Sequence, residues 1–196
     1  MGDNTIKRCE WLSDDPLYIK YHDEEWGVPQ YDSLRLFEML CLEGQQAGLS
    51  WLTVLKKREN YRQVFHGFDP YKISNFTKTE LLELKKNSSI IRHEGKIQAI
   101  FENSLCYLQL VREGTDFSDF IWSFVGKKPI VNYWVQNKDI PKETSTSKAL
   151  AKALKEKGFK FLESKTCYAF MQACGLVNDH IVSCICRQTL QESTID

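Results

Sequence analysis

Asn87-Ser88-Ser89-Ile90-Ile91-Arg92-His93 lies between two stretches that have the periodicity of helices. Upstream, the pattern Thr77-Lys78-Thr79-Glu80 is typical of a capping box, in which both outer side chains bind free amides at a helix start. Downstream, a stripe with a spacing of three and four runs over four turns, as in an amphipathic helix: Ile97, Ile100, Phe101, Ser104, Leu105, Leu108 and Val111. The sequence therefore predicts a helix–hairpin–helix unit over about 77–112, with its hairpin plugged by Ile90 and Ile91.

Helical patterns also dominate the rest of the chain. We expect helices over about 33–45, 48–65, 117–125, 147–157 and 165–174, with Gly158 and Gly175 as C-terminal stops. Extended structure is indicated only at 128–134, and the polar segment 136–147, which contains a proline, predicts a flexible loop. The 196 residues suit one all-helical domain over 1–196.

Composition narrows the class of protein. Apolar runs fall short of the roughly 20 residues of a membrane helix, and residues 1–8 lack the apolar stretch of a signal peptide. We therefore expect a cytoplasmic protein without a membrane partner. Its seven cysteines, an odd number, argue against a disulfide framework in that compartment.

The formal net charge of zero conceals an uneven distribution. Residues 1–45 carry 4 basic and 10 acidic side chains, whereas residues 56–100 carry 10 basic and 5 acidic ones. A basic stretch of this kind suits a DNA-binding face, because affinity for DNA comes largely from neutralised phosphates. Charge by itself favours the alternative, an ordinary solvated helix surface.

Four cysteine and histidine side chains from the two ends of the chain are candidate metal ligands. His180 and Cys184 lie four residues apart, so on a helix they would share one face, and Cys9 and His22 would complete a tetrahedral Cys2His2 site. Cys186 is a competing ligand. The alternative is a pair of buried thiols and two surface imidazoles.

Aromatic side chains crowd the N-terminal segment. Trp11, Tyr18, Tyr21 and Trp26 fall within sixteen residues and are interspersed with acids. An aromatic pocket beside a polar surface would suit a flat, electron-poor or cationic ligand. Structural packing of the same rings is the alternative.

A third candidate is the segment 41–51, Cys-Leu-Glu-Gly-Gln-Gln-Ala-Gly-Leu-Ser-Trp. Its Glu43 follows an apolar helix, and Gly44 and Gly48 permit a tight backbone close to a ligand. A partly buried Glu43 would be a candidate for binding or catalysis, whereas an exposed one would be an ordinary surface residue.

Several of these stretches, in order, resemble the bacterial 3-methyladenine DNA glycosylase I family. The resemblance runs from about residue 8 to 186. It rests on Leu17-Tyr18-Ile19-Lys20-Tyr21-His22-Asp23-Glu24-Glu25-Trp26-Gly27-Val28-Pro29, on residues 43–51, 90–93 and 158–161, and on residues 170–180.

The resemblance implies an all-α fold of the helix–hairpin–helix DNA glycosylase superfamily. It implies a structural Zn²⁺ on Cys9, His22, His180 and Cys184 that joins residues about 1–30 and 176–190 into one lobe. It also implies a base pocket, with the wedge Leu49 entering the DNA gap and with these lining residues: Trp11, Tyr18, Tyr21, Trp26, Glu43 and Trp51. Two departures are Ser88 and Ser89 in place of hairpin glycines, and no aspartate that can be nominated as catalytic.

The implied activity is removal of 3-methyladenine from alkylated double-stranded DNA, with free 3-methyladenine as product. The base would be flipped into the pocket, where Glu43 and Tyr21 make polar contacts and Trp11 stacks. We expect Arg92 and Lys96 to contact DNA, and no Schiff-base lysine in the pocket, hence no strand cleavage. We expect a monomer at the bacterial nucleoid. A non-catalytic DNA-binding module and a zinc hydrolase are the alternative functions.

Overall fold

The computed structural model describes residues 6–187. In this part of the chain the helices are α1 (Pro16–Glu24), α2 (Ser33–Gln45), α3 (Trp51–Val64), α4 (Pro70–Ile73), α5 (Lys78–Leu84), α6 (Glu94–Arg112), α7 (Phe117–Ser123), α8 (Ser145–Glu156) and α9 (Ser164–Ala173). Two 3₁₀ turns, η1 (His66–Phe68) and η2 (Asn137–Asp139), and two short strands, β1 (Ile130–Val131) and β2 (Val177–Asn178), complete the described elements.

Side-chain caps determine where most of these helices begin. Asp32, Ser50 and Asp116 each accept a hydrogen bond from an amide in the first turn of α2, α3 and α7. The predicted helix over 33–45 is confirmed, and the other predicted helices over 48–65, 117–125, 147–157 and 165–174 are confirmed within a few residues. The helices α1 and α4 were not predicted, and each starts with an Asp cap followed by a proline.

Helices α5 and α6 flank the segment predicted as a hairpin. The Thr77–Glu80 capping box is present, and Ile90 is buried in the hairpin. The predicted stripe on α6 is partly wrong, because Leu105 and Val111 are exposed. Since α6 packs against α2, α4, α5 and α7, its buried face is wider than one stripe.

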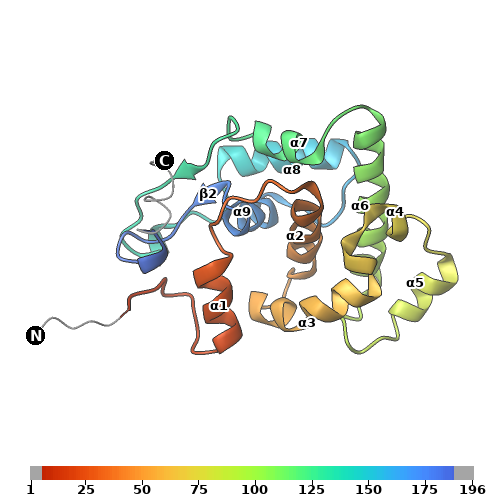
Figure 1. Ribbon diagram of the computed structural model, residues 1–196, viewed down its shortest axis with the longest axis horizontal. Coiled ribbons are helices and arrows are strands. Elements are labelled where there is room, and N and C mark those ends of the chain that lie inside the picture. The colour runs from red at the N-terminus through yellow and green to blue at the C-terminus, as the bar shows by residue number, and fades with distance from the viewer. Residues whose placement is uncertain (1–5, 188–196) are drawn as a thin grey trace, which may run out of the picture.

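The two ends of the described chain meet at one end of the molecule, where the Ile185 backbone N–H donates to the Lys7 carbonyl, while α5 and α6 form the opposite end (Figure 1). The strands β1 and β2 pair in parallel there. Gly175 permits this meeting: its φ is 68°, and a Cβ would lie 2.4 Å from the Val28 carbonyl carbon. Among residues 6–187, no helix is both long and apolar enough to cross a bilayer.

The loop predicted over 136–147 is shorter than expected. It contains η2, and α8 begins at Ser145 after a reciprocal capping box between Thr144 and Ser147. The extended segment is confirmed only as the two-residue strand β1. These connections bring residues 137–142 against the N-terminal aromatic segment, where they form one wall of a cavity.

Candidate functional site

A cavity of about 480 Å³ opens between α1, the end of α2, the start of α3, η2 and α9. All six side chains that sequence resemblance implied for a pocket line it: Trp11, Tyr18, Tyr21, Trp26, Glu43 and Trp51. Its volume falls within the roughly 300–1,000 Å³ of small-molecule sites. The cavity is therefore large enough to hold a purine-sized ligand.

Ring–ring contacts hold the aromatic wall together. Trp11 lies between Tyr18 and Trp26, with ring centroids 5.1 and 5.0 Å away. Tyr21 packs against Trp51 with centroids 5.5 Å apart. Such a wall of electron-rich rings attracts a flat, electron-poor or cationic ligand.

Glu43 is the buried acid of the cavity. It lies near the end of α2 with 4% of its surface exposed, and its Oε2 has no hydrogen-bond partner among residues 6–187. Burial raises the pKa of Glu43 to about 8. Burial also raises the pKa of the neighbouring Tyr21 hydroxyl well above its usual value.

The loop after α2 leaves the cavity for the surface. Gly48 adopts a φ of 77°, a region that glycine occupies without strain, and the next residue, Leu49, is 41% exposed. The Ser50 hydroxyl then caps α3. This geometry exposes Leu49 to solvent, on the loop that joins the cavity residues Glu43 and Trp51.

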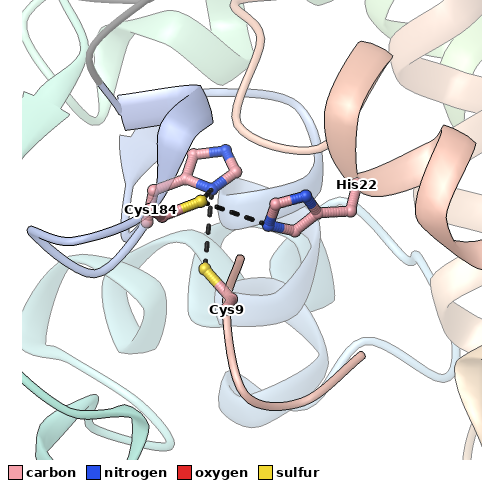
Figure 2. Close-up of side chains that lie close together, drawn as sticks. Cys9, His22 and Cys184 are labelled. Carbon is pink, nitrogen blue, oxygen red and sulfur yellow. Dashed lines mark hydrogen bonds between the residues drawn. The ribbon is translucent and has the colours of Figure 1, made fainter. Parts of the chain in front are cut away.

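Cys9, His22, His180 and Cys184 form a fully buried cluster whose ligand atoms all lie within 4.8 Å of one another. Cys184 Sγ lies 3.5 Å from His22 Nε2 and 3.4 Å from His180 Nδ1, and Cys9 Sγ lies 3.6 Å from His180 Nδ1. Figure 2 shows Cys9, His22 and Cys184 pointing toward one another from an N-terminal loop, α1 and the C-terminal segment. The cluster can hold a metal ion.

His180 and Cys184 share one face of a turn and not of a helix. The strand β2 ends at Asn178, and residues 180–184 form a turn rather than a helix. The turn brings the two side chains together all the same, because the backbone N–H of Cys184 donates to the Ile181 carbonyl.

A second layer of contacts orients the histidines. His22 Nδ1 lies 2.7 Å from Asp23 Oδ1, and Arg8 binds the same carboxylate, which lowers the pKa of Asp23 to about 2. His180 Nε2 donates to the Trp26 carbonyl at 2.9 Å. Both rings therefore direct their other nitrogen at the Cys184 thiol, as metal-ligating histidines do.

Cys186 lies on the far side of His22. Its Sγ is 3.7 Å from His22 Nδ1 and 3.6 Å from Asp23 Oδ1, in a second group of three side chains that has His22 in common with the first. Hydrogen bonds with Cys186 and Cys9, and with the two histidines, lower the pKa of Cys184 well below its usual range. Of the two competing cysteines, Cys184 has the better geometry for the four-residue cluster.

The cluster packs against side chains that line the cavity. The Trp26 ring lies edge-on to His180 with centroids 4.6 Å apart, and Trp11 lies 5.3 Å from the His22 ring. The Cys/His cluster thus supports the back of the aromatic wall.

The hairpin is fixed to α3 through its carbonyl groups. Lys57 Nζ donates to the Ser88 and Ser89 carbonyls, and Asn60 Nδ2 donates to Ser89. Arg92 is exposed beside the hairpin, where a phosphate can reach it.

The expected DNA contact of Lys96 is wrong. Its side chain is buried, with the residue 5% exposed, and Nζ donates to the Gln45 and Ala47 carbonyls at 2.7 Å each. The end of α2 comes against α6 at this point and leaves helix-terminal carbonyls that the ammonium satisfies.

Sequence reasoning missed part of the cavity wall. Residues from the 137–142 segment and from α9 also line it, among them Ile140, Tyr168 and Gln172. Two lysines that were not anticipated, Lys142 and Lys165, line it as well. Both are exposed. The spacing of Tyr168 and Gln172 by one helical turn was a usable signal for a shared face.

Comparisons with known proteins agree over nearly the whole chain. A family model described as methyladenine glycosylase matches residues 11–188. DNA-3-methyladenine glycosylase 1 of Escherichia coli is 59% identical over 181 residues, covering 92% of this chain and 97% of that protein. DNA-3-methyladenine glycosylase of Haemophilus influenzae is 54% identical over 180 residues, covering 92% and 97%.

Solved structures show the same architecture. A crystal structure of 3-methyladenine DNA glycosylase I has a TM-score of 0.91 and 58% identity, and the match covers 92% of this chain and 99% of that one. A structure that describes 3-methyladenine recognition by the Staphylococcus aureus enzyme has a TM-score of 0.89 at 39% identity, with 91% and 95% covered.

Proposed function

The chain belongs to the methyladenine glycosylase family, and we propose that it removes 3-methyladenine from alkylated DNA by hydrolysing the N-glycosidic bond. The observation that carries this proposal is Glu43, a buried carboxyl inside an aromatic cavity, with one oxygen that no group in the described part of the chain pairs. An unpaired buried acceptor is costly unless a ligand supplies the missing donor.

Glu43 and Tyr21 are the residues we assign to base recognition and catalysis. In DNA, 3-methyladenine is cationic, and a cation beside Glu43 favours the ionised carboxylate. The carboxylate then accepts a hydrogen bond from the exocyclic amine, whereas guanine presents an acceptor at the same place. Tyr21 supplies the second polar contact, and Trp11, Tyr18, Trp26 and Trp51 hold the flat ring.

The reaction needs little acid catalysis, because the methylated base already carries the positive charge that makes it a good leaving group. The base must leave the helical stack to reach the cavity, and Leu49 is placed to enter the gap that it leaves. The bond between base and sugar then breaks. The base takes the bonding electrons and leaves neutral, and water adds to the cationic sugar carbon and releases a proton to solvent.

We propose that the enzyme does not cleave the strand. A Schiff-base lysine must reach its neutral form, which burial favours. Lys142 and Lys165 are exposed at the cavity, so they suit contact with phosphates instead.

The Cys/His cluster is proposed to hold a structural Zn²⁺. Bonds of about 2.3 Å to sulfur and about 2.0–2.1 Å to nitrogen put tetrahedral S···N edges at about 3.5 Å. The three sulfur–nitrogen distances of 3.4 to 3.6 Å fit such a site. Four protein ligands close the coordination shell, which argues against a zinc hydrolase. When bound, the ion would supply stability by joining residues 6–30 and 176–187 into one lobe of a single domain. The outer parts of the proposed lobe, residues 1–5 and 188–190, lie outside the described residues.

We further propose that the protein acts as a monomer on double-stranded DNA in the bacterial cytoplasm, at the nucleoid. The bacterial origin of the named relatives supports the compartment. A non-catalytic DNA-binding module would account for the hairpin but would have no use for a buried, unpaired Glu43.

The direct test is chromatography of bases released from methylated duplex DNA. We expect free 3-methyladenine to appear with time and 7-methylguanine to stay in the polymer. Intact DNA without released base, bound with measurable affinity, would instead support the non-catalytic module.

A further inference from the structure

Gln45 and Lys96 form reciprocal hydrogen bonds between two helices. Gln45 is the last residue of α2, and Lys96 is the third residue of α6. Lys96 Nζ donates to the main-chain carbonyl of Gln45, while Gln45 Nε2 donates at 3.2 Å to the main-chain carbonyl of Lys96. Both residues are buried, so these hydrogen bonds are shielded from water.

The same lysine also holds the loop that carries Leu49. Its second bond goes to the Ala47 carbonyl at 2.7 Å, two residues before Leu49. The last carbonyls of α2 have no partner within the helix, and their negative end favours a cation. A lysine from another helix therefore fixes the direction in which the chain leaves α2.

Tyr61 connects this pair to the hairpin. Its hydroxyl donates to Gln45 Oε1 and accepts from the Ile91 backbone N–H, both at 3.1 Å. Tyr61 is fully buried on α3. A continuous chain of hydrogen bonds thus runs from the hairpin through Tyr61 and Gln45 to Lys96 and the Leu49 loop.

We propose that Lys96, Gln45 and Tyr61 are positioning residues that set the Leu49 loop at a defined offset from the hairpin. The inference rests on the proposed function. DNA held at the hairpin by its phosphates presents the damaged base at a fixed distance, so the wedge must stand at the matching place. A misplacement of about 1 Å at such a point can reduce a rate by about 100-fold. The network acts on base extrusion and leaves recognition of the free base to the cavity.

The test is a double-mutant cycle between Lys96→Met and Leu49→Ala. Methionine has a similar length and no donor. We expect each single variant to lower the single-turnover rate of 3-methyladenine release from duplex DNA about tenfold or more. If Lys96 acts through the wedge, the double variant releases base no more than about twofold more slowly than Leu49→Ala alone.

Calorimetry with free 3-methyladenine separates positioning from general damage. We expect every variant of the cycle to bind the free base within about twofold of wild type, because the cavity is unchanged. Lys127→Met is the matched control: Lys127 is exposed and pairs with Asp119, outside the network. It should leave both the rate and the affinity near wild type.

Tyr61→Phe provides a second variant if Lys96→Met does not fold. It removes only the hydroxyl between Gln45 and Ile91, and we expect a smaller fall in rate that also disappears in the Leu49→Ala background. If the rate effects of the network substitution and of Leu49→Ala multiply in the double variant, the positioning role is overturned. A parallel loss of affinity for the free base would also overturn it. Neither result would affect the proposed function. A wild-type enzyme that releases no 3-methyladenine would overturn the proposed function and this inference with it.

Discussion

Glu43 and Trp51 line the same cavity, and each has one buried polar atom without a hydrogen-bond partner among residues 6–187. Glu43 Oε2 is an acceptor, and Trp51 Nε1 is a donor. A ligand that offers one donor and one acceptor would satisfy both. The exocyclic amine and a ring nitrogen of 3-methyladenine have this pattern.

Trp51→Phe tests the donor of this pair. The variant keeps an aromatic ring against Tyr21 but loses the indole N–H. We expect affinity for free 3-methyladenine to fall by about 3- to 10-fold, as for one lost hydrogen bond, with an unchanged melting temperature. Trp122→Phe is the matched control, because Trp122 Nε1 donates to the Gln30 carbonyl. Trp122→Phe should lower the melting temperature and keep the affinity for 3-methyladenine. If Trp51→Phe instead lowers the melting temperature and keeps the affinity, Trp51 Nε1 has no part in recognition.

Glu43→Gln should change stability in a pH-dependent way. The pKa of Glu43 rises from 4.5 to about 8 on folding, so the folded state holds more protons than the unfolded state between these values. The free energy of unfolding of wild type therefore falls as pH rises from about 4.5 to 8, and this loss levels off above pH 8. The Glu43→Gln variant lacks this loss. Its free energy of unfolding, compared with that of wild type, should therefore rise by up to about 4 kcal/mol between low pH and pH 8. Melting curves at pH 5 and pH 8 measure the difference, and a constant difference would contradict a buried, neutral Glu43.

Metal content tests the Cys/His cluster. We expect about one zinc per chain in freshly purified protein. Cys9→Ser should remove the zinc and lower the melting temperature by roughly 5–15 °C, because the ligands join both ends of the chain. Cys186→Ser is the control and should retain the zinc. Zinc that persists in Cys184→Ser would assign the fourth ligand to Cys186.

Arg92→Gln tests the hairpin as the phosphate contact. We expect weaker binding to duplex DNA of any sequence, and a log–log salt slope that is smaller by about 1. Arg112→Gln, at the other end of α6, is the control and should bind as wild type does. An unchanged slope in Arg92→Gln would place the DNA face elsewhere.

Helix positions were predictable from the sequence where the signal was local. The Thr77–Glu80 box and the 33–45 pattern act within one or two turns, and both were confirmed. The α6 stripe was only partly right, because burial of Tyr107 and exposure of Leu105 depend on which helices surround α6. Such contacts are set by the tertiary structure and leave no periodic trace.

The cavity residues likewise divide into those with a local sequence signal and those placed only by the tertiary structure. Six of the cavity's aromatic and acidic residues lie in two N-terminal segments, and the resemblance to the family implied them as one set. Lys96 was misassigned because a lysine near a hairpin has the same local pattern whether it faces DNA or satisfies distant carbonyls. Lys142 and Lys165 were missed because η2 and α9 reach the cavity only through the fold.

Calorimetric titration of free 3-methyladenine into wild type and Glu43→Gln decides whether Glu43 recognises the base. The amide is similar in shape to the carboxyl but cannot become an ionised acceptor. We expect Glu43→Gln to bind the base at least about tenfold more weakly, with its fold, zinc content and DNA affinity retained. The exposed Glu156→Gln, on α8, is the matched control. Equal affinities in wild type and Glu43→Gln would remove Glu43 from recognition and reduce the recognition site to the aromatic cluster.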